Sequence, residues 1–318
     1  MALSLAESAK LSTTNLQRGV IETFVQESSI LDRIPLMPIE GNSYSYNEEA
    51  TLPGVAFRGV NEGYTESTGT VNQKSESLVI LGGDADVDRF IVQTRGNLND
   101  QRAIQTRMKV KAAAFKYQDT FFNGDTATDP KSFDGLRKRL TGTQVISAGT
   151  NGAPIVGNGG ADAHAFFDLL DGLVGSVPGL NSTNGAIYAN RQVIAKIKSA
   201  ARRLGGYEMV REALTGKLVA TYNGIPLLDP GQTAAGADIL PQTETQGTAT
   251  DASSVYAVRF GQTEDDQAVT GLTNGGVMVD DLGQLESKPA YRTRIEFYCG
   301  LAVFGGKASA RLNGVLAK

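Results

Sequence analysis

The longest helical pattern of the chain is residues 97–124, which read NLNDQRAIQTRMKVKAAAFKYQDTFFNG. Its apolar side chains recur at the spacing of an amphipathic helix, which puts them on one face: Ile104, Met108, Ala112, Phe115 and Phe122. Asn97 or Asn99 can cap its start. Asn123-Gly124 can end it, because glycine accepts a left-handed cap. We therefore expect a helix of about 25 residues, about 37 Å long.

The stretch before this helix, residues 41–81, has no helical period. Ser43 to Asn47 alternates, as does the region from Val71 to Ile80, and Pro53-Gly54 with three further glycines lies between them. This pattern predicts a long two-stranded excursion with a turn-rich tip. Because an isolated two-stranded ribbon is only marginally stable in water, we expect it to lie on a neighbouring copy of the chain.

Residues 1–40 predict an arm with one helix. Thr14 and Gln17 stand at capping-box spacing, and Ile34-Pro35 with Met37-Pro38 stops the helix because proline disfavours it at the preceding residue. Between them lies an apolar stripe at helical spacing: Leu16, Val20, Ile21, Phe24 and Val25. Such a stripe, with little nearby chain to cover it, indicates a partner surface.

Mixed elements fill the rest of the chain. Residues 84–92 alternate between acidic and apolar side chains, which predicts a strand, and the Gly- and Thr-rich residues 141–161 predict a loop at a domain border. Residues 162–280 read as a compact α/β unit with helices at 166–173 and 193–204 and strands at 186–189, 225–228 and 255–260. Asn190 can cap the second helix, and Asn223-Gly224 predicts a turn before the strand at 225–228. The last region, 292–303 and 308–315, predicts strands with glycine breaks.

The composition limits the classes of function. The 318 residues hold 30 basic and 34 acidic side chains, a net charge of −4, whereas dedicated nucleic-acid binders are usually strongly basic. One Cys and one His exclude a disulfide within the chain, a thiolate metal cage and any site with two histidines. Residues 1–10 lack a basic and apolar signal pattern and no apolar stretch approaches 18 residues, so we expect neither signal peptide nor membrane helix.

The sequence contains no complete catalytic, phosphate-binding or calcium-binding motif. His164 opens a helix with no G-x-S-x-G elbow in the chain, and Cys299 lies in the apolar run from Phe297 to Leu301, which favours a buried inert thiol. Gly306-Lys307 is followed by Ala rather than Ser or Thr, so it is no phosphate loop. Asp84, Asp86 and Asp88 have the spacing of a calcium loop but lack its Gly and Glu, which favours the wet face of a strand. We expect no catalytic residue, no cofactor and no metal.

Charge is segregated along the chain. Residues 95–116 carry six basic and one acidic side chain (+5), residues 262–286 six acidic and no basic (−6), and residues 287–318 six basic and one acidic (+5). Two interpretations remain open here: copies of the chain meet plus to minus, or each segment is a separate solvated face.

The order of these parts resembles the major capsid proteins of tailed phages, which share the Hong Kong 97 phage capsid fold. The resemblance rests on a series of segments: 29–35 (SILDRIP), the loop opening at 41–46 (GNSYSY), the long helix 97–122, 187–191 (IYANR) before a basic helix, 222–227 (YNGIPL) and 294–303 (RIEFYCGLAV). It covers nearly the whole chain.

The resemblance implies an α+β fold with an N-terminal arm (1–40), an extended β-hairpin loop (41–81), a peripheral domain (82–150 and 276–318) with a spine helix at 97–122, and an axial domain (151–275). It implies a virion protein, assembled in the host cytoplasm, that forms hexamers and pentamers around double-stranded DNA. Its partners would be itself, a separate scaffolding protein, a portal, weakly bound DNA and a decoration protein, with no membrane. Lys74 is the only lysine of the loop and lies off its tip, so we expect no covalent crosslink.

The arm, the loop and the long helix supply the residues that we expect to touch neighbouring subunits: Phe24, Val25, Tyr44, Tyr46, Phe57, Arg58, Tyr64, Arg102 and Lys109. Two alternatives stay open. One is an encapsulin-like nanocompartment shell of the same fold that encloses protein. The other is an α/β enzyme with a carboxylate site at Asp265-Asp266 or Asp280-Asp281, although adjacent carboxylates on an extended chain point to different sides.

Overall fold

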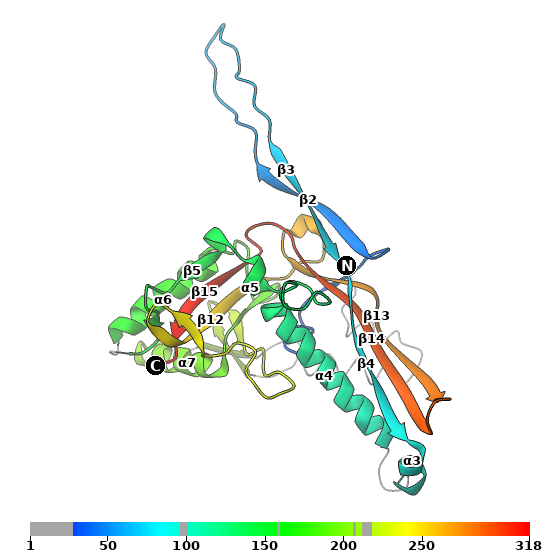
Figure 1. Ribbon diagram of the computed structural model, residues 1–318. Coiled ribbons are helices and arrows are strands. Elements are labelled where there is room, and N and C mark those ends of the chain that lie inside the picture. The colour runs from blue at the N-terminus through cyan, green and yellow to red at the C-terminus, as the bar shows by residue number, and fades with distance from the viewer. Residues whose placement is uncertain (1–27, 96–100, 158–159, 206–207, 212–217) are drawn as a thin grey trace.

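The computed structural model describes residues 28–95, 101–157, 160–205, 208–211 and 218–318. The arm helix predicted between Thr14 and Val25 lies outside these residues. Two sheets, with helices packed against them, form the body, and a long β-hairpin projects away from it (Figure 1).

The first sheet has four strands in the order β1-β13-β14-β4. Its strands are β1 (Leu36–Pro38), β13 (Val269–Gln284), β14 (Ala290–Val303) and β4 (Val79–Asp88). The two longest, β13 and β14, pair antiparallel from Val269 opposite Val303 to Gln284 opposite Tyr291, and β4 pairs antiparallel with β14 on the other side. The strand predicted at 84–92 therefore ends earlier, at Asp88, whose side chain accepts a hydrogen bond from the Phe90 amide (2.7 Å) at the start of α3 (Arg89–Arg95).

The long helix is α4 (Gln101–Asn123), and it runs beside β4 and β14 (Figure 1). Its buried face carries Val110, Ala114, Tyr117 and Phe121, which pack into one core with Val277, Ile295 and Phe297 of the sheet. Gly124 follows the helix without the expected left-handed conformation. Glycine is needed there because a Cβ would come within 2.3 Å of the Phe133 carbonyl oxygen. The short helix α5 (Leu136–Arg139) and a 3-10 turn, η1 (Gly142–Gln144), then lead to the second sheet.

The second sheet has nine strands, seven of them in the order β5-β15-β12-β7-β10-β9-β8. They are β5 (Val145–Ser147), β15 (Ser309–Leu316), β12 (Ala249–Arg259), β7 (Gly185–Tyr188), β10 (Ile225–Leu228), β9 (Leu218–Tyr222) and β8 (Glu208–Arg211). β6 (Ala153–Pro154) pairs with β15, and β11 (Glu244–Gln246) pairs with β12. Asn223 and Gly224, both at positive φ (50° and 76°), make the predicted tight turn between β9 and β10.

Two helices cover one face of this sheet. α6 (Gly160–Gly175) and α7 (Arg191–Arg203) share one core with alternate residues of β7, β12 and β15, such as Ile187, Val255 and Leu312. The Asn190 side chain caps α7 by accepting a hydrogen bond from the Gln192 amide (2.8 Å), as the sequence pattern predicts. The opposite face belongs to the core of the first sheet: the ring of Phe122 lies 5.5 Å from that of Tyr188 and 5.1 Å from that of Tyr256. The two sheets are therefore joined through the end of α4.

The structure corrects the expected division of the chain at its C-terminus. Residues 309–316, placed in the peripheral domain by the sequence, form β15, which lies between β5 and β12 in the nine-stranded sheet. Residues 145–154 also add strands to this sheet rather than forming a structureless border. The reason is that β5, β6 and β12 supply backbone partners on both sides of β15, a pairing that no local pattern reveals. The rest of the division into peripheral and axial domains stays a prediction.

The described end of the arm also differs from expectation. Ile30, Leu31 and Ile34 are buried in the subunit's own core, and Leu36 to Pro38 pair parallel with Gly271 to Thr273. Residues 28–40 are therefore part of the subunit body, and only the preceding residues remain candidates for an arm that reaches a neighbour.

Candidate functional site

The projecting hairpin consists of β2 (Ser43–Thr51) and β3 (Thr70–Ser77), paired from Ser43 opposite Ser77 to Thr51 opposite Thr70. Its register follows the alternation in the sequence, and the Thr51 and Thr70 hydroxyl groups close the ladder at 2.6 Å. Residues 52–69 beyond this pair contain no strand. The hairpin and this tip stand clear of the body in Figure 1.

The base of the hairpin is fixed to its own subunit by aromatic packing. The Tyr46 ring meets the edge of Phe304 at 4.8 Å, and its hydroxyl donates to the Val303 carbonyl at 3.2 Å. Tyr44 stacks on Tyr46 and donates to the Glu264 carboxylate at 3.0 Å, in the 3-10 turn η2 (Glu264–Asp266). Burial raises the pKa of the Tyr46 hydroxyl to about 12, so this hydroxyl stays protonated at neutral pH and keeps its hydrogen bond to Val303.

An ion pair holds the base from the other strand. The Arg139 guanidinium, at the end of α5, binds both carboxylate oxygens of Glu76, with Nη2 2.7 Å from Oε2. Both side chains are largely buried. A two-pronged contact of this kind fixes direction as well as distance, and it sets the angle at which the hairpin leaves the body.

The tip of the hairpin shows the opposite pattern. Large apolar side chains there are almost completely exposed: Leu52, Val55 (97%), Phe57 (108%), Val60 (92%) and Tyr64. Arg58 lies over the Tyr64 ring at 5.3 Å and donates to the Glu62 carbonyl. A contiguous apolar segment that its own subunit leaves uncovered marks an interaction surface.

The structure places the predicted contact residues in three different settings. Phe57, Arg58 and Tyr64 lie on the exposed tip, where their role in subunit contacts stays a prediction. Tyr46 is only 4% exposed and packs inside its own subunit, so it supports the hairpin rather than touching a neighbour, and Tyr44 packs beside it. The alternation of tyrosines in β2 did not distinguish these two roles. Phe24 and Val25 lie outside the described residues.

The two predicted residues of α4 also make contacts within the subunit. Arg102 donates to the Asp281 carboxylate of β13 at 2.6 Å and lies over the Tyr291 ring at 5.1 Å. Lys109 is half-buried beside β4, where its side chain occupies the space next to Gly83. The exposed face of α4 therefore consists of other residues, among them Ile104, Arg107 and Met108.

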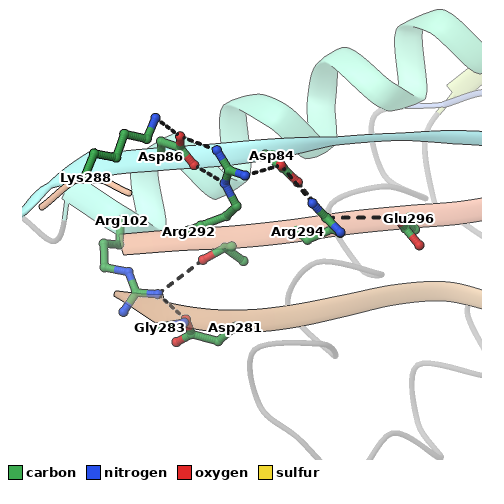
Figure 2. A network of polar contacts seen from close by, with 10 residues as sticks. Asp84, Asp86, Arg102, Asp281, Gly283, Lys288, Arg292, Arg294 and Glu296 are labelled. Atoms are coloured by element: carbon green, nitrogen blue, oxygen red, sulfur yellow. Dashed lines mark hydrogen bonds and ion pairs between the residues drawn. The ribbon is translucent and has the colours of Figure 1, made fainter. Parts of the chain in front are cut away.

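Acidic β4 and basic β14 face each other in an ion-pair ladder (Figure 2). Arg294 binds Asp84 through Nε (2.8 Å), and Arg292 binds Asp86 through Nε (2.7 Å) and Asp84 through Nη1 (3.0 Å). Lys288 adds a contact to Asp86 at 2.5 Å. Asp84, Asp86 and Asp88, whose spacing resembled that of a calcium loop, thus lie on β4, as expected. The ion pairs also neutralise part of the basic charge of residues 287–318 within the subunit.

The ladder makes acid stability depend on two carboxylates. Hydrogen bonds from Arg294 hold the pKa of Asp84 below its usual value, and those from Arg292 and Lys288 do the same for Asp86. Their folded-state pKa values lie below the unfolded value of about 3.9. Their contribution to stability is therefore complete above about pH 4 and is lost as pH falls below it, because the unfolded chain then binds protons that the folded chain excludes.

We predict that Asp84→Asn with Asp86→Asn lowers the urea midpoint at pH 7 but flattens its decline between pH 4.5 and pH 2. Asp265→Asn, which changes an exposed carboxylate outside the ladder, is the control and should follow the wild-type profile. Urea titrations of the unassembled subunit across this pH range measure both effects. A double variant whose midpoint falls as steeply as that of the wild type would contradict the role of the ladder.

The groups considered for catalysis do not converge in the described part of the chain. Cys299 is fully buried on β14, and burial raises the pKa of its thiol far above its ordinary value. His164 is exposed on α6. Within the described ranges, no three His, Cys, Asp or Glu side chains are grouped to hold a metal ion. Asp280 and Asp281 lie on different sides of β13, opposite Arg294 and Thr293.

Among the helices of the described residues, none is long and apolar enough to cross a membrane.

The sequence was compared with models of protein families and with curated proteins. Residues 13–166 match the family model described as major capsid protein GP7. None of the curated proteins matches the sequence.

Solved structures resemble the chain over almost its whole length. The holo-SrpI encapsulin complex from Synechococcus elongatus PCC 7942 is 19% identical, with a TM-score of 0.67 over 100% of this chain and 98% of that chain. The capsid of a native GTA particle is 13% identical (TM-score 0.64; 91% and 90% covered), and Mycobacterium phage Bobi is 14% identical (TM-score 0.57; 90% and 89% covered). At these identities the likeness concerns the fold, which is the α+β fold expected from the sequence.

Proposed function

We propose that this chain is a structural shell subunit that builds the icosahedral head of a tailed phage around double-stranded DNA. Its Hong Kong 97-like capsid fold supports the proposal, and so does the match of residues 13–166 to the family model described as major capsid protein GP7. In this head it forms hexamers and pentamers, and it acts without catalysis. The observation that carries the proposal is the hairpin, whose base is fixed to its own subunit while its apolar tip is left uncovered.

The isolated subunit leaves the large apolar side chains of the tip exposed to water. Each large apolar side chain of the tip gains roughly 1.5–3 kcal/mol when it moves from water into an apolar contact. The subunit alone does not provide that contact, so a neighbouring copy that does is stabilised by it. When the tip of one copy contacts a different surface of the next copy, the contact is heterologous, and it gives a closed ring when the rotation from copy to copy closes. Folding and assembly are then linked.

The proposed partners follow from this role. We propose that assembly takes place in the host cytoplasm with a separate scaffolding protein and a portal, and that a decoration protein binds the finished head. The procapsid of satellite phage P4, a structure of similar fold, includes a size determination protein. That solved structure supports the idea of an assembly partner without identifying one for this chain.

A second candidate function is a compartment shell that encloses protein instead of DNA. The likeness to the encapsulin complex, which covers the whole chain at the TM-score of 0.67, favours it specifically. Both proposed functions require the subunit to assemble into a closed shell, and they differ in what the shell contains.

Electron microscopy of the purified protein tests the shell, and nuclease treatment of particles from the natural source tests their content. We expect closed shells tens of nanometres across that protect double-stranded DNA from nuclease. Shells that hold protein and no nucleic acid would replace the phage head with the compartment. A monomer or dimer that persists at high concentration would contradict both functions.

A further inference from the structure

Helix α7 carries a cluster of positive charge. Its residues Arg191–Arg203 include five basic side chains and no acidic one: Arg191, Lys196, Lys198, Arg202 and Arg203. No carboxylate in the described part of the chain lies within ion-pairing distance of them. By contrast, Arg102, Arg139, Arg292 and Arg294 all form ion pairs within the subunit.

The helix presents these charges on one side. Val193, Ile194, Ile197 and Ala200 are buried against the sheet, so the opposite side faces solvent. At 100° per residue, Arg191, Lys198 and Arg202 form one row along that side, and Lys196 and Arg203 form a second. Between the rows lie only small or uncharged side chains, Gln192, Ala195 and Ser199. Because the side chains between the two cationic rows are small or uncharged, a polyanion can approach both rows closely.

We propose that this side of α7 is the surface with which the shell subunit contacts packaged double-stranded DNA, and that it therefore faces the lumen; the inference rests on the proposed phage-head function. The contact uses phosphates rather than bases, because the face offers cations without the exposed aromatic side chains that stack on single strands. Two rows about 20 Å long, the length of 13 residues at 1.5 Å each, suit a duplex backbone.

The chemistry favours nucleic acid over an acidic surface of a second copy. Within the subunit, Arg191 acts electrostatically on Asp229 and Asp238. On the neighbouring helix α6, Asp168 is exposed and Asp171 accepts a hydrogen bond from Tyr222 at 2.6 Å. α6 thus offers no row of carboxylates to match the two cationic rows. The basic stripe predicted on α4 is weaker than that of α7, because Arg102 is paired and Lys111 lies against the Phe115 ring.

A salt titration of the unassembled subunit with a fluorescent 24-base-pair duplex tests the contact. The variant Lys196→Gln, Lys198→Gln, Arg202→Gln, Arg203→Gln keeps good helix formers and removes four cations. Since the slope of log K against log salt is about −0.9 per phosphate contact, we expect a slope of about −4.5 for five contacts and a slope shallower by about 3.6 in the variant. The wild type should then lose about 500-fold in affinity between 50 and 200 mM salt, and the variant about threefold to fourfold.

The matched control removes four exposed cations elsewhere: Arg89→Gln, Lys116→Gln, Lys131→Gln and Lys307→Gln. It should shift the slope by less than 1. Equal effects of the two variants would overturn the inference, since general charge would then explain binding. A competition experiment gives a second test. If polyglutamate of equal total charge displaces the duplex as effectively as competitor DNA, the inference is overturned in favour of an acidic protein.

A labelling experiment tests the orientation. The only cysteine, Cys299, is buried, so Ala195→Cys introduces one reactive thiol between the two cationic rows. We expect a maleimide on a polyethylene glycol chain too large to pass the shell to label dissociated subunits but not intact DNA-filled particles. Complete labelling of intact particles would place α7 outside and overturn the inference. If the particles contain no DNA, the proposed function fails, while the duplex titration still decides the inference by itself.

Discussion

Replacing residues 52–69 with Asn-Gly should give a subunit that folds normally and forms no shells. The two strands of the hairpin end opposite each other at Thr51 and Thr70, so a two-residue turn of this type can connect them in the native register. The residues removed include the five large apolar side chains of the tip, none of which is buried in its own subunit. The subunit therefore loses no core, and its melting temperature should change by less than about 2 °C.

The effect on assembly should be large. If two of those side chains bury fully on a neighbour, the lost stabilisation is roughly 4 kcal/mol per contact, which corresponds to about a thousandfold in the association constant. Circular dichroism checks the fold, and electron microscopy with light scattering checks assembly over a range of concentrations.

The control for this deletion is Glu62→Gln with Glu66→Gln, which changes the charge of the tip and keeps its apolar surface. It should assemble. Normal shells from the deletion variant would show that the tip is dispensable. A deletion variant that fails to fold would show that the tip belongs to the subunit's own stability.

Phe122→Ala should have the reverse effect and destabilise the subunit itself. Phe122 is fully buried at the end of α4 and packs on Tyr188 and Tyr256 of the nine-stranded sheet and on Phe121. Truncating a buried phenylalanine typically costs 3–5 kcal/mol, because the transfer term is lost and a cavity remains. For a chain of this size that is a fall of about 6 °C in the melting temperature, measured on the unassembled subunit by calorimetry.

Phe57→Ala is the matched control, because the same residue type is truncated on the exposed tip. It should leave the subunit's melting temperature unchanged and weaken assembly. A fall of less than 2 °C for Phe122→Ala would mean that the two sheets do not depend on this junction. The pair of variants therefore separates the core of one subunit from the contact between subunits.

Several elements could be predicted because their signals are local. The helix over Gln101–Asn123, the hairpin of 43–77, the Asn190 cap and the Asn223-Gly224 turn each depend on side-chain spacing or backbone freedom within a short stretch. The buried state of Cys299 also follows from its apolar neighbours. Contacts between subunits were harder to predict from the sequence. The pattern of the hairpin did not show that Tyr46 is buried within its own subunit while the side chains of the tip are exposed.

Periodicity and turn chemistry act over a few residues, so most elements, their order and the presence of a long hairpin can be predicted before the chain is seen folded. Which elements share a sheet depends on contacts between distant parts of the chain. The tertiary fold placed β15 between β5 and β12, paired Asp84 and Asp86 with Arg292 and Arg294, and put no described carboxylate within ion-pairing distance of the α7 cations. Those outcomes depend on backbone and charge pairing between residues as many as 210 positions apart, and nothing in the local pattern specifies such partners.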